Sequence, residues 1–294
     1  MKQKSFNMDD KLVNEIEQLC KNAKTASYAL QSASSETKNS ILKFAAQAII
    51  DNKELIKNAN NQDLTSAKIK NLSAAMIDRL TLNDSRIESI AKALLDICDL
   101  EDPVGKVIWS NDRPNGLKIK RVTVPLGLLA VIYESRPNVT ADAFALCLKS
   151  GNAVILKPGS ESFATSKCIF EILVKSVENF NLPGQIVNMV PNSSREIVDI
   201  LLSMDSYIDV VVPRGGKNLI RKVQDASKIP VFKHLDGNCH TYIHANADIK
   251  IAKSVLFNAK LRRTGICGAT ESVIIDKTII DQASNIFKDL HDEG

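Results

Sequence analysis

The sequence predicts an α/β protein with a doubly wound parallel sheet, preceded by N-terminal helices and followed by the start of a second α/β domain. Two observations predict this class. From residue 128 onward, short apolar runs alternate with amphipathic helical segments, and this repetition is typical of a parallel sheet with helices on both faces. The first hundred residues instead carry apolar residues at helical spacing.

The N-terminal region is expected to consist of amphipathic helices. One apolar stripe comprises Ile41, Phe44, Ala45, Ala48 and Ile49, and this spacing places them on one helical face. The pair Ser85 and Glu88 has the spacing of a capping box and predicts that another helix begins there. After this region, side chains of residues 116–124 alternate in character, which predicts an exposed extended strand.

The predicted sheet is formed by five apolar runs, at 128–133, 153–156, 186–190, 208–212 and 230–232. The segments between them are long enough for helices, at 139–150, 163–179, 193–203 and 217–226. A further helix is expected over 248–260 and a further strand over 272–276. Ligands of parallel sheets bind at the carboxyl ends of the strands, so the residues that follow each run are the candidates for a site.

The composition is that of a globular protein. The chain has 294 residues, 44% of them hydrophobic and 24% charged, with a net charge of +4. This small excess argues against a nucleic-acid-binding protein, and the absence of a long apolar run argues against a membrane span or a secretory signal. The six cysteines lack zinc-ligand spacing. We therefore expect a cytoplasmic protein with reduced thiols and no metal site.

Lys157 ends one of the apolar runs, in the string GNAVILKPGSES. Gly159 permits a tight turn, and Ser160 or Ser162 can cap the next helix. The start of that helix would offer N–H groups and a positive dipole end to an anion. Lys157 could add its charge to a phosphate or donate to a ribose. The alternative interpretation is a solvated lysine at a strand end.

Two further motifs follow strand runs. The string PRGG (213–216) would let Gly215 and Gly216 approach a phosphate, with Arg214 as a charge partner. It is not a GxGxxG fingerprint, so a plain turn is the alternative. Asn138 follows the string YESRP, and its amide could face the crevice at the sheet edge. The alternative for Asn138 is the N-cap of the next helix.

Cys267 differs from the other five cysteines in its setting. It is flanked by Gly265 and Gly268 and preceded by Arg262 and Arg263. A thiolate is the nucleophile in acyl-transfer chemistry, and nearby positive charge favours the thiolate. The remaining cysteines lie mostly in apolar patterns, which predict small buried side chains. Cys267 is therefore the candidate nucleophile.

Taken together and in this order, the motifs resemble the gamma-glutamyl phosphate reductase family of the aldehyde dehydrogenase superfamily. The resemblance covers nearly the whole chain and runs through residues 56–68, 71–80, 124–162, 208–220, 230–240 and 258–271. It implies an aldehyde dehydrogenase-like fold. It also implies an oxidoreductase of proline biosynthesis that uses NADPH to reduce gamma-glutamyl phosphate to glutamate 5-semialdehyde, releasing phosphate.

The resemblance implies a role for individual residues. Cys267 matches the family's nucleophile, which forms a thioester, and Asn138 matches the oxyanion-hole asparagine. Lys157 and Ser160 fall where the adenosine ribose of NADP and its phosphate are held. The remaining assignments are Arg214, Gly215 and Gly216 for the cofactor, and Arg136 and Arg263 for the anionic ends of the substrate. A serine at position 160, with Glu161 pointing away, predicts a preference for NADPH over NADH.

We expect two parts in the chain. Residues 1–248 would hold the N-terminal helices and the nicotinamide-dinucleotide-binding domain. Residues 249–294 would be the incomplete beginning of the catalytic domain, in which the strand after Cys267 lacks sheet neighbours. The expected partners are the small-molecule substrate, glutamate 5-kinase and, for a full-length version, further copies of the chain.

Two other functions compete with the reductase. One is an NAD-linked aldehyde dehydrogenase that oxidises free aldehydes, and the other is a catalytically impaired remnant that still binds nucleotide. Oxidising relatives place a glutamate base in the segment that corresponds to HLDG (234–237), where this chain has His234. A thioester that is reduced needs no base to activate water, so the sequence favours the reductase over the oxidising enzyme.

Overall fold

The computed structural model describes residues 10–234, 237–262, 264 and 266–293. The chain divides into two compact units, Met1–Lys233 and His234–Gly294, and this division lies ahead of the boundary expected near residue 248. None of the helices in the described part of the chain combines the length and the apolar character needed to cross a lipid bilayer.

The first unit begins with the expected helices, α1 (Asp10–Gln31), α2 (Ser35–Asp51), α3 (Lys53–Ile69), α4 (Ala74–Leu80) and α5 (Asp84–Asp99). The capping box predicted at Ser85 is wrong. Asn83 is the N-cap of α5, and its side chain accepts a hydrogen bond from the Arg86 N–H at 2.9 Å. Asparagine is as good an N-cap as serine, so the helix begins two positions earlier than the Ser–Glu spacing suggested.

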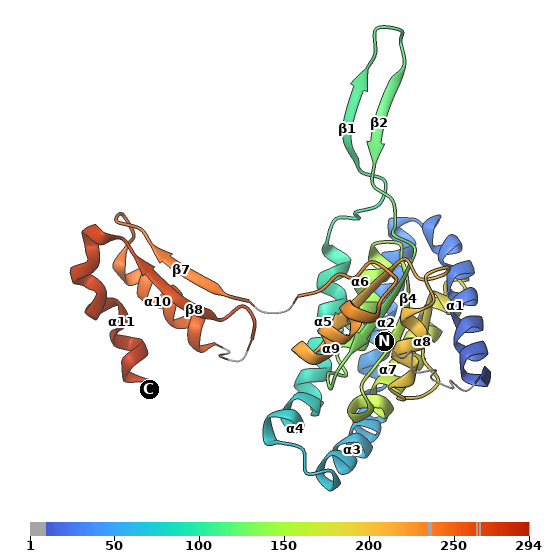
Figure 1. Cartoon of the computed structure of the whole chain (residues 1–294), viewed down its shortest axis with the longest axis horizontal. Coiled ribbons are helices and arrows are strands. Elements are labelled where there is room, and N and C mark those ends of the chain that lie inside the picture. The colour runs from blue at the N-terminus through green and yellow to red at the C-terminus, as the bar shows by residue number, and fades with distance from the viewer. Residues whose placement is uncertain (1–9, 235–236, 263, 265, 294) are drawn as a thin grey trace, which may run out of the picture. The chain divides into compact units, whose positions relative to one another are not determined.

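A two-stranded antiparallel hairpin follows, formed by β1 (Val107–Asp112) and β2 (Lys118–Val122). In Figure 1 it extends away from the helices and sheet of the first unit as a separate arm. Every residue of β2 is exposed, which confirms the exposed strand expected over 116–124. Its partner β1 was not predicted, because the string VIWSND shows no regular alternation.

The rest of the first unit contains β3 (Leu128–Tyr133), α6 (Val139–Lys149), β4 (Ala153–Lys157), η1 (Ser160–Ser162), α7 (Phe163–Glu178), η2 (Gly184–Ile186), β5 (Val187–Met189), α8 (Glu196–Leu202), β6 (Val210–Arg214) and α9 (Lys217–Ala226). The strands form a parallel sheet in the order β5-β4-β3-β6. This confirms the predicted fold class. The fifth run, at 230–232, contributes only an isolated bridge between Val211 and Val231.

Alternating residues of β3 face two different hydrophobic cores. Leu129, Val131 and Tyr133 belong to a cluster with residues of α2, α5, α6 and α7. Leu128, Ala130 and Ile132 belong to a second cluster with residues of α1, α8 and α9. A strand buried on both faces reads as a continuous apolar run, which is why LLAVIY was recognisable in the sequence. The result is a three-layer sandwich with helices on both faces of the sheet.

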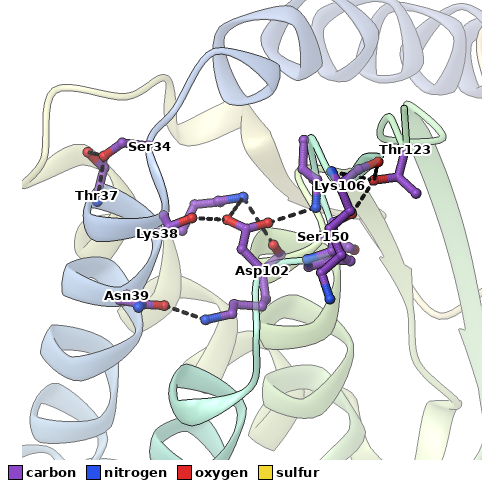
Figure 2. A network of polar contacts seen from close by, with 12 residues as sticks. Ser34, Thr37, Lys38, Asn39, Asp102, Lys106, Thr123 and Ser150 are labelled. Carbon is purple, nitrogen blue, oxygen red and sulfur yellow. Dashed lines mark hydrogen bonds and ion pairs between the residues drawn. The ribbon is translucent and has the colours of Figure 1, made fainter. Parts of the chain in front are cut away.

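A buried charge network lies where the arm joins the first unit (Figure 2). Lys38 of α2 is 2% exposed, and its Nζ lies 2.5 Å from Asp102 Oδ2, in the segment before β1. The same ammonium donates to the Lys149 carbonyl at the end of α6 at 3.2 Å. Asp102 also accepts from the Val104 N–H at 2.9 Å. The network thus ties two helices to the start of the arm.

The second unit contains β7 (Cys239–Ile243), α10 (Ile249–Leu261), β8 (Thr270–Ile275), η3 (Lys277–Gln282) and α11 (Ala283–Asp292). The expectation that the strand after Cys267 lacks a sheet neighbour is wrong, because β8 pairs in parallel with β7. The buried core of this unit is small and consists of Ile243, Leu256 and Ile286, with further apolar residues packed against it.

Candidate active site

A pocket of about 500 Å³ lies at the carboxyl edge of the sheet in the first unit. Its lining comes from the ends of β3 and β4, the segment after β5, and the helices α4, α8 and α9. Apolar, polar and charged side chains share the wall, among them Met76, Glu134, Lys157, Ser160, Glu161, Arg195, Val198, Leu219 and Lys222. This position is where parallel sheets bind their ligands, and the volume suits a small organic molecule.

Lys157 is buried in the wall of this pocket. Only 5% of the residue is exposed, and its Nζ donates to the carbonyl oxygens of Pro158 at 3.0 Å and Ser193 at 3.4 Å. Burial lowers the pKa of Lys157, since a desolvated ammonium is disfavoured, while the charge of Glu161 opposes this shift. The alternative of a solvated lysine is therefore wrong. The protein holds a cation at the end of β4 with neutral acceptors around it.

Ser160 and Glu161 line the same pocket. The Ser160 hydroxyl donates to Glu161 Oε1 at 2.9 Å. The expectation that Glu161 points away is wrong. Both residues belong to η1, a turn of 3-10 helix, in which successive side chains are separated by roughly 120° rather than alternating between opposite faces. A carboxylate therefore faces the pocket beside the serine.

The start of α7 is capped by a distant carboxylate. Asp63 of α3 accepts hydrogen bonds from the Ala164 N–H at 3.2 Å, the Thr165 N–H at 2.8 Å and the Thr165 hydroxyl at 2.5 Å. Ser162, at the N-cap position, makes no side-chain cap. The prediction that this helix start is open to an anionic ligand is therefore wrong. Burial raises the pKa of Asp63, while the hydrogen bonds from Thr165 and Ala164 oppose that shift.

The glycines of the PRGG string receive a carboxylate from the protein itself. Gly216 is the N-cap of α9, and its N–H donates to Glu134 Oε2 at 2.8 Å. A Cβ atom on Gly215 would lie 2.6 Å from the same oxygen, so a larger residue at this position would displace the Glu134 carboxylate. Arg214, the last residue of β6, is exposed. Glu134 follows β3 and also lines the pocket, which brings the PRGG turn next to it.

Asn138 precedes α6, and its side chain does not cap that helix. Its Nδ2 atom instead donates to Asp142 Oδ2, one helical turn further along, at 2.9 Å. The N-cap alternative for the side chain is therefore wrong. Burial raises the pKa of Asp142, against the lowering effects of the Asn138 hydrogen bond and the Arg214 charge. Arg136, two residues before Asn138, is exposed.

Cys267 lies in the second unit and is exposed. It belongs to a tight turn that precedes β8, closed by a hydrogen bond from the Ala269 N–H to the Ile266 carbonyl at 3.1 Å. Arg262 is exposed as well, while the predicted substrate residue Arg263 and the neighbouring Gly265 fall outside the described residues.

Four other cysteines are buried as predicted, namely Cys20, Cys98, Cys147 and Cys168. Burial raises the pKa of the Cys20 thiol to about 12, with a further contribution from Glu17, and it raises that of Cys147 to about 12. A buried neutral thiol is a poor nucleophile. In the ranges that the structure describes, no three His, Cys, Asp or Glu side chains gather as ligands for a metal ion.

Several residues that line the pocket or contact the predicted site residues were not predicted from the sequence. Glu134 follows the run LLAVIY directly, and the rule that ligand residues follow strands could have identified it. Arg195 and Lys222 bring two more cations to the pocket wall, but no local motif marks them. Asp63 and Asp142 act through contacts with Thr165 and Asn138, and nothing in their own sequence context indicates those contacts.

Comparison with known proteins agrees with this architecture. The aldehyde dehydrogenase family matches residues 3–292. A gamma-glutamyl phosphate reductase of Paramagnetospirillum magneticum is 51% identical over 255 residues, which is 87% of this chain and 60% of that protein. One from Brucella suis is 50% identical over 87% of this chain and 61% of that protein. The chain thus spans about 60% of the length of these curated relatives.

Solved structures show the same relationship. The crystal structure of gamma-glutamyl phosphate reductase from Thermotoga maritima has a TM-score of 0.85 and 35% identity, covering 94% of this chain and 67% of that one. The structure from Saccharomyces cerevisiae has a TM-score of 0.69 and 34% identity, covering 94% of this chain and 75% of that one. The chain therefore belongs to the aldehyde dehydrogenase family and, within it, to the gamma-glutamyl phosphate reductases.

Proposed function

We propose that this chain acts in the NADPH-dependent reduction of gamma-glutamyl phosphate to glutamate 5-semialdehyde, with release of phosphate. The observation that carries the proposal is the identity of about half of its residues to proteins that bear this activity in their name. The geometry of the pocket and the exposure of Cys267 are consistent with it.

The pocket of the first unit fits a nicotinamide dinucleotide. Lys157, Arg195 and Lys222 supply cations for the phosphates, and the Ser160 hydroxyl suits a ribose. Met76, Val198 and Leu219 supply apolar wall for a planar ring. When bound, the reduced cofactor would supply the hydride that converts an enzyme thioester to the aldehyde. Because Asp63 and Glu134 already cap the starts of α7 and α9, the binding of anionic groups falls to the side-chain cations.

The proposed roles of the other residues follow the chemistry of acyl transfer. The Cys267 thiolate attacks the acyl carbon, and the bond between this carbon and the phosphate oxygen breaks. The amide of Asn138 stabilises the oxyanion that forms before phosphate leaves, and Asp142 orients that amide. The Arg136 and Arg263 side chains are proposed to bind the anionic ends of the substrate.

The reverse reaction tests the proposal. The purified chain is assayed for oxidation of glutamate 5-semialdehyde with NADP, with and without inorganic phosphate, and NADPH binding is measured by calorimetry. Reductase chemistry requires turnover that depends on phosphate and is lost in Cys267→Ser but kept in Cys239→Ser.

The two competing functions give different results in the same assay. Turnover with NAD that does not need phosphate would identify an aldehyde-oxidising enzyme. NADPH binding without turnover in either assay would identify a nucleotide-binding protein without this activity.

A further inference from the structure

We infer that Cys239 and Cys267 are an oxidant-sensitive pair that closes to a reversible disulfide. The two residues are 28 positions apart in the sequence, yet the Cys239 Sγ atom lies 3.2 Å from the carbonyl oxygen of Cys267 and donates to it. That oxygen is two covalent bonds from the Cα atom that carries the Cys267 side chain. The thiol of one cysteine is thus held against the backbone of the other.

Gly237 permits the close approach of the segments that carry Cys239 and Cys267. A Cβ atom on Gly237 would lie 1.8 Å from the Cys267 carbonyl oxygen and 3.4 Å from Cys239 Sγ. Only glycine leaves room for this contact. The segment that carries Cys239 therefore packs directly on the turn that carries Cys267.

The pairing of β7 with β8 brings the two cysteines to the same end of the ladder. Cys239 is paired with Thr270 at the start of the β7–β8 ladder, and Cys267 lies in the turn immediately before β8. A disulfide needs Cα atoms roughly 4.4–6.8 Å apart, and the contact of Cys239 Sγ with the Cys267 carbonyl oxygen at 3.2 Å brings the two residues close to that range. The Cys267 side chain is exposed, so it can change rotamer toward Cys239 without displacing a packed core.

These two thiols are also the accessible ones. Cys239 is half-buried and Cys267 is exposed, while Cys20, Cys98, Cys147 and Cys168 are buried. Oxidation follows exposure and thiolate character. Peroxide should therefore reach this pair before the four buried thiols.

The chemistry needs a peroxide as oxidant. The thiolate of one cysteine attacks a peroxide oxygen, the O–O bond breaks, and a sulfenic acid and water result. The second thiolate then attacks the sulfenic sulfur, the S–O bond breaks, and the S–S bond forms with release of a second water. Two electrons pass from the two sulfurs to the peroxide. A dithiol reductant reverses the reaction by thiol–disulfide exchange.

The disulfide follows from the contacts alone. Its consequence for catalysis rests on the proposed function, because a Cys267 sulfur bonded to Cys239 cannot attack an acyl phosphate. Mapping of the cross-link therefore tests the disulfide, and measurement of activity tests the proposed function. A negative result in one does not imply a negative result in the other.

The test treats the purified chain with hydrogen peroxide at a small molar excess, blocks remaining thiols with iodoacetamide, and digests without reduction. We expect a peptide that links Cys239 to Cys267, an intact mass lower by two hydrogens, and loss of both signals after dithiothreitol. In Cys239→Ser, the linked peptide should be lost and Cys267 should instead give a dimedone-trapped sulfenic acid.

Gly237→Ala provides a variant that keeps both thiols. The added methyl group should push the two segments apart and reduce the yield of the linked peptide, while circular dichroism checks that the chain stays folded. Cys147→Ser is the matched control and should leave the linked peptide unchanged. The inference is overturned if wild type and Cys239→Ser accumulate the same Cys267 sulfenic acid and neither contains the linked peptide.

Discussion

At the scale of single residues, the first unit keeps several charges out of water and gives each of them specific partners. Asp63 is 7% exposed and accepts from the start of α7. Lys157 is 5% exposed and donates to carbonyl oxygens. A buried charge costs several kcal/mol unless it is compensated. The ammonium of Lys157 donates to the neutral carbonyl oxygens of Pro158 and Ser193, which is typical of a residue kept for a ligand.

Replacing Lys157 by Met is expected to weaken NADPH binding by about tenfold to a hundredfold, because it removes a charge-assisted hydrogen bond whose contribution to affinity is of that size. The methionine retains the packing of the lysine stem, so the free energy of unfolding should stay equal or rise. Calorimetry of NADPH binding and chemical denaturation measure the two effects. The exposed Lys175→Met on α7 is the control. Unchanged NADPH affinity together with lower stability would contradict a ligand-binding role.

The same residue predicts a dependence of stability on pH. The pKa of Lys157 is lowered in the folded state, whereas the unfolded chain keeps the ordinary value of about 10.4. Between these two values the unfolded state binds more protons, so the stability of the wild type should rise with pH in that window. Denaturation curves across the window should show this slope in wild type and a smaller one in Lys157→Met. Equal slopes in the two proteins would mean that Lys157 titrates normally.

Glu161 is expected to weaken the preference for NADPH. Its carboxylate lines the pocket beside Ser160 and would repel a 2′-phosphate. Replacing Glu161 by Gln retains an acceptor for Ser160 and removes about 1 kcal/mol of repulsion. NADPH should then bind roughly fivefold more tightly, with little change for NADH. Equal changes for the two cofactors would place the 2′-phosphate away from Glu161.

At the scale of elements, the network at the base of the β1–β2 arm joins segments that are far apart in the sequence (Figure 2). Lys38 contacts Asp102 and the Lys149 carbonyl, while Lys149 Nζ donates to Asn39 Oδ1 at 2.7 Å and to the Cys98 carbonyl at 2.8 Å. The ends of α5 and α6 therefore meet α2 through two buried ammonium groups. This arrangement fixes the place where the chain leaves the helices to form the arm.

Replacing Asp102 by Asn is expected to destabilise the first unit by about 3–5 kcal/mol, because it leaves the Lys38 charge buried without a carboxylate. Burial alone would raise the pKa of Asp102, but hydrogen bonds from Lys38, Ser35 and Val104 outweigh it, and the pKa is lowered. The stabilisation is thus present above the ordinary value of about 3.9 and is lost as pH falls through the lowered one. Urea denaturation at several pH values measures both effects.

Two controls accompany this prediction. The exposed pair of Lys106 and Glu101 at 2.6 Å should contribute less than about 1 kcal/mol, as measured by Lys106→Ala. Combining Lys38→Met with Asp102→Leu should recover most of the stability, since an apolar pair of similar volume removes both buried charges. A double variant as unstable as Asp102→Asn would show that the ion pair itself stabilises the fold.

At the scale of the whole molecule, the two units differ in how much core they contain. The first unit has apolar clusters on both faces of a four-stranded sheet. Among the described residues, the second has a two-stranded sheet and a central cluster of three buried apolar residues. Two strands with a small core are marginally stable. We therefore expect the second unit to open more readily than the first.

Hydrogen exchange with mass spectrometry measures this difference. Amides of β7, β8 and α10 should exchange faster than those of β3 and β4. Replacing Leu256 by Ala should cost about 2–5 kcal/mol locally and raise exchange throughout the second unit, with no change in β3 or β4. Replacing Ile155 by Ala is the reciprocal control in the first unit. Equal protection in both units would contradict the expectation.

The amino-acid pattern alone predicted most strands and helices of the parallel sheet and the positions at which candidate site residues follow them. The run LLAVIY coincides with β3, and the predicted segment at 217–226 coincides with α9. Lys157, Ser160 and Arg214 follow from the rule that ligands meet the carboxyl ends of strands. These features depend on local periodicity, and the residues of a single segment are enough to show that periodicity.

Which groups meet at those ends depends on how distant segments of the chain pack together. Asp63 closes the start of α7 from about a hundred positions away, and Glu134 does the same for Gly216. The pairing of β7 with β8 also depends on contacts across the second unit. The packing of whole elements determines such partners. A hydrogen bond between distant residues produces no periodic pattern in the sequence around either residue. For the same reason, the contact between Cys239 and Cys267 could not be predicted from the sequence.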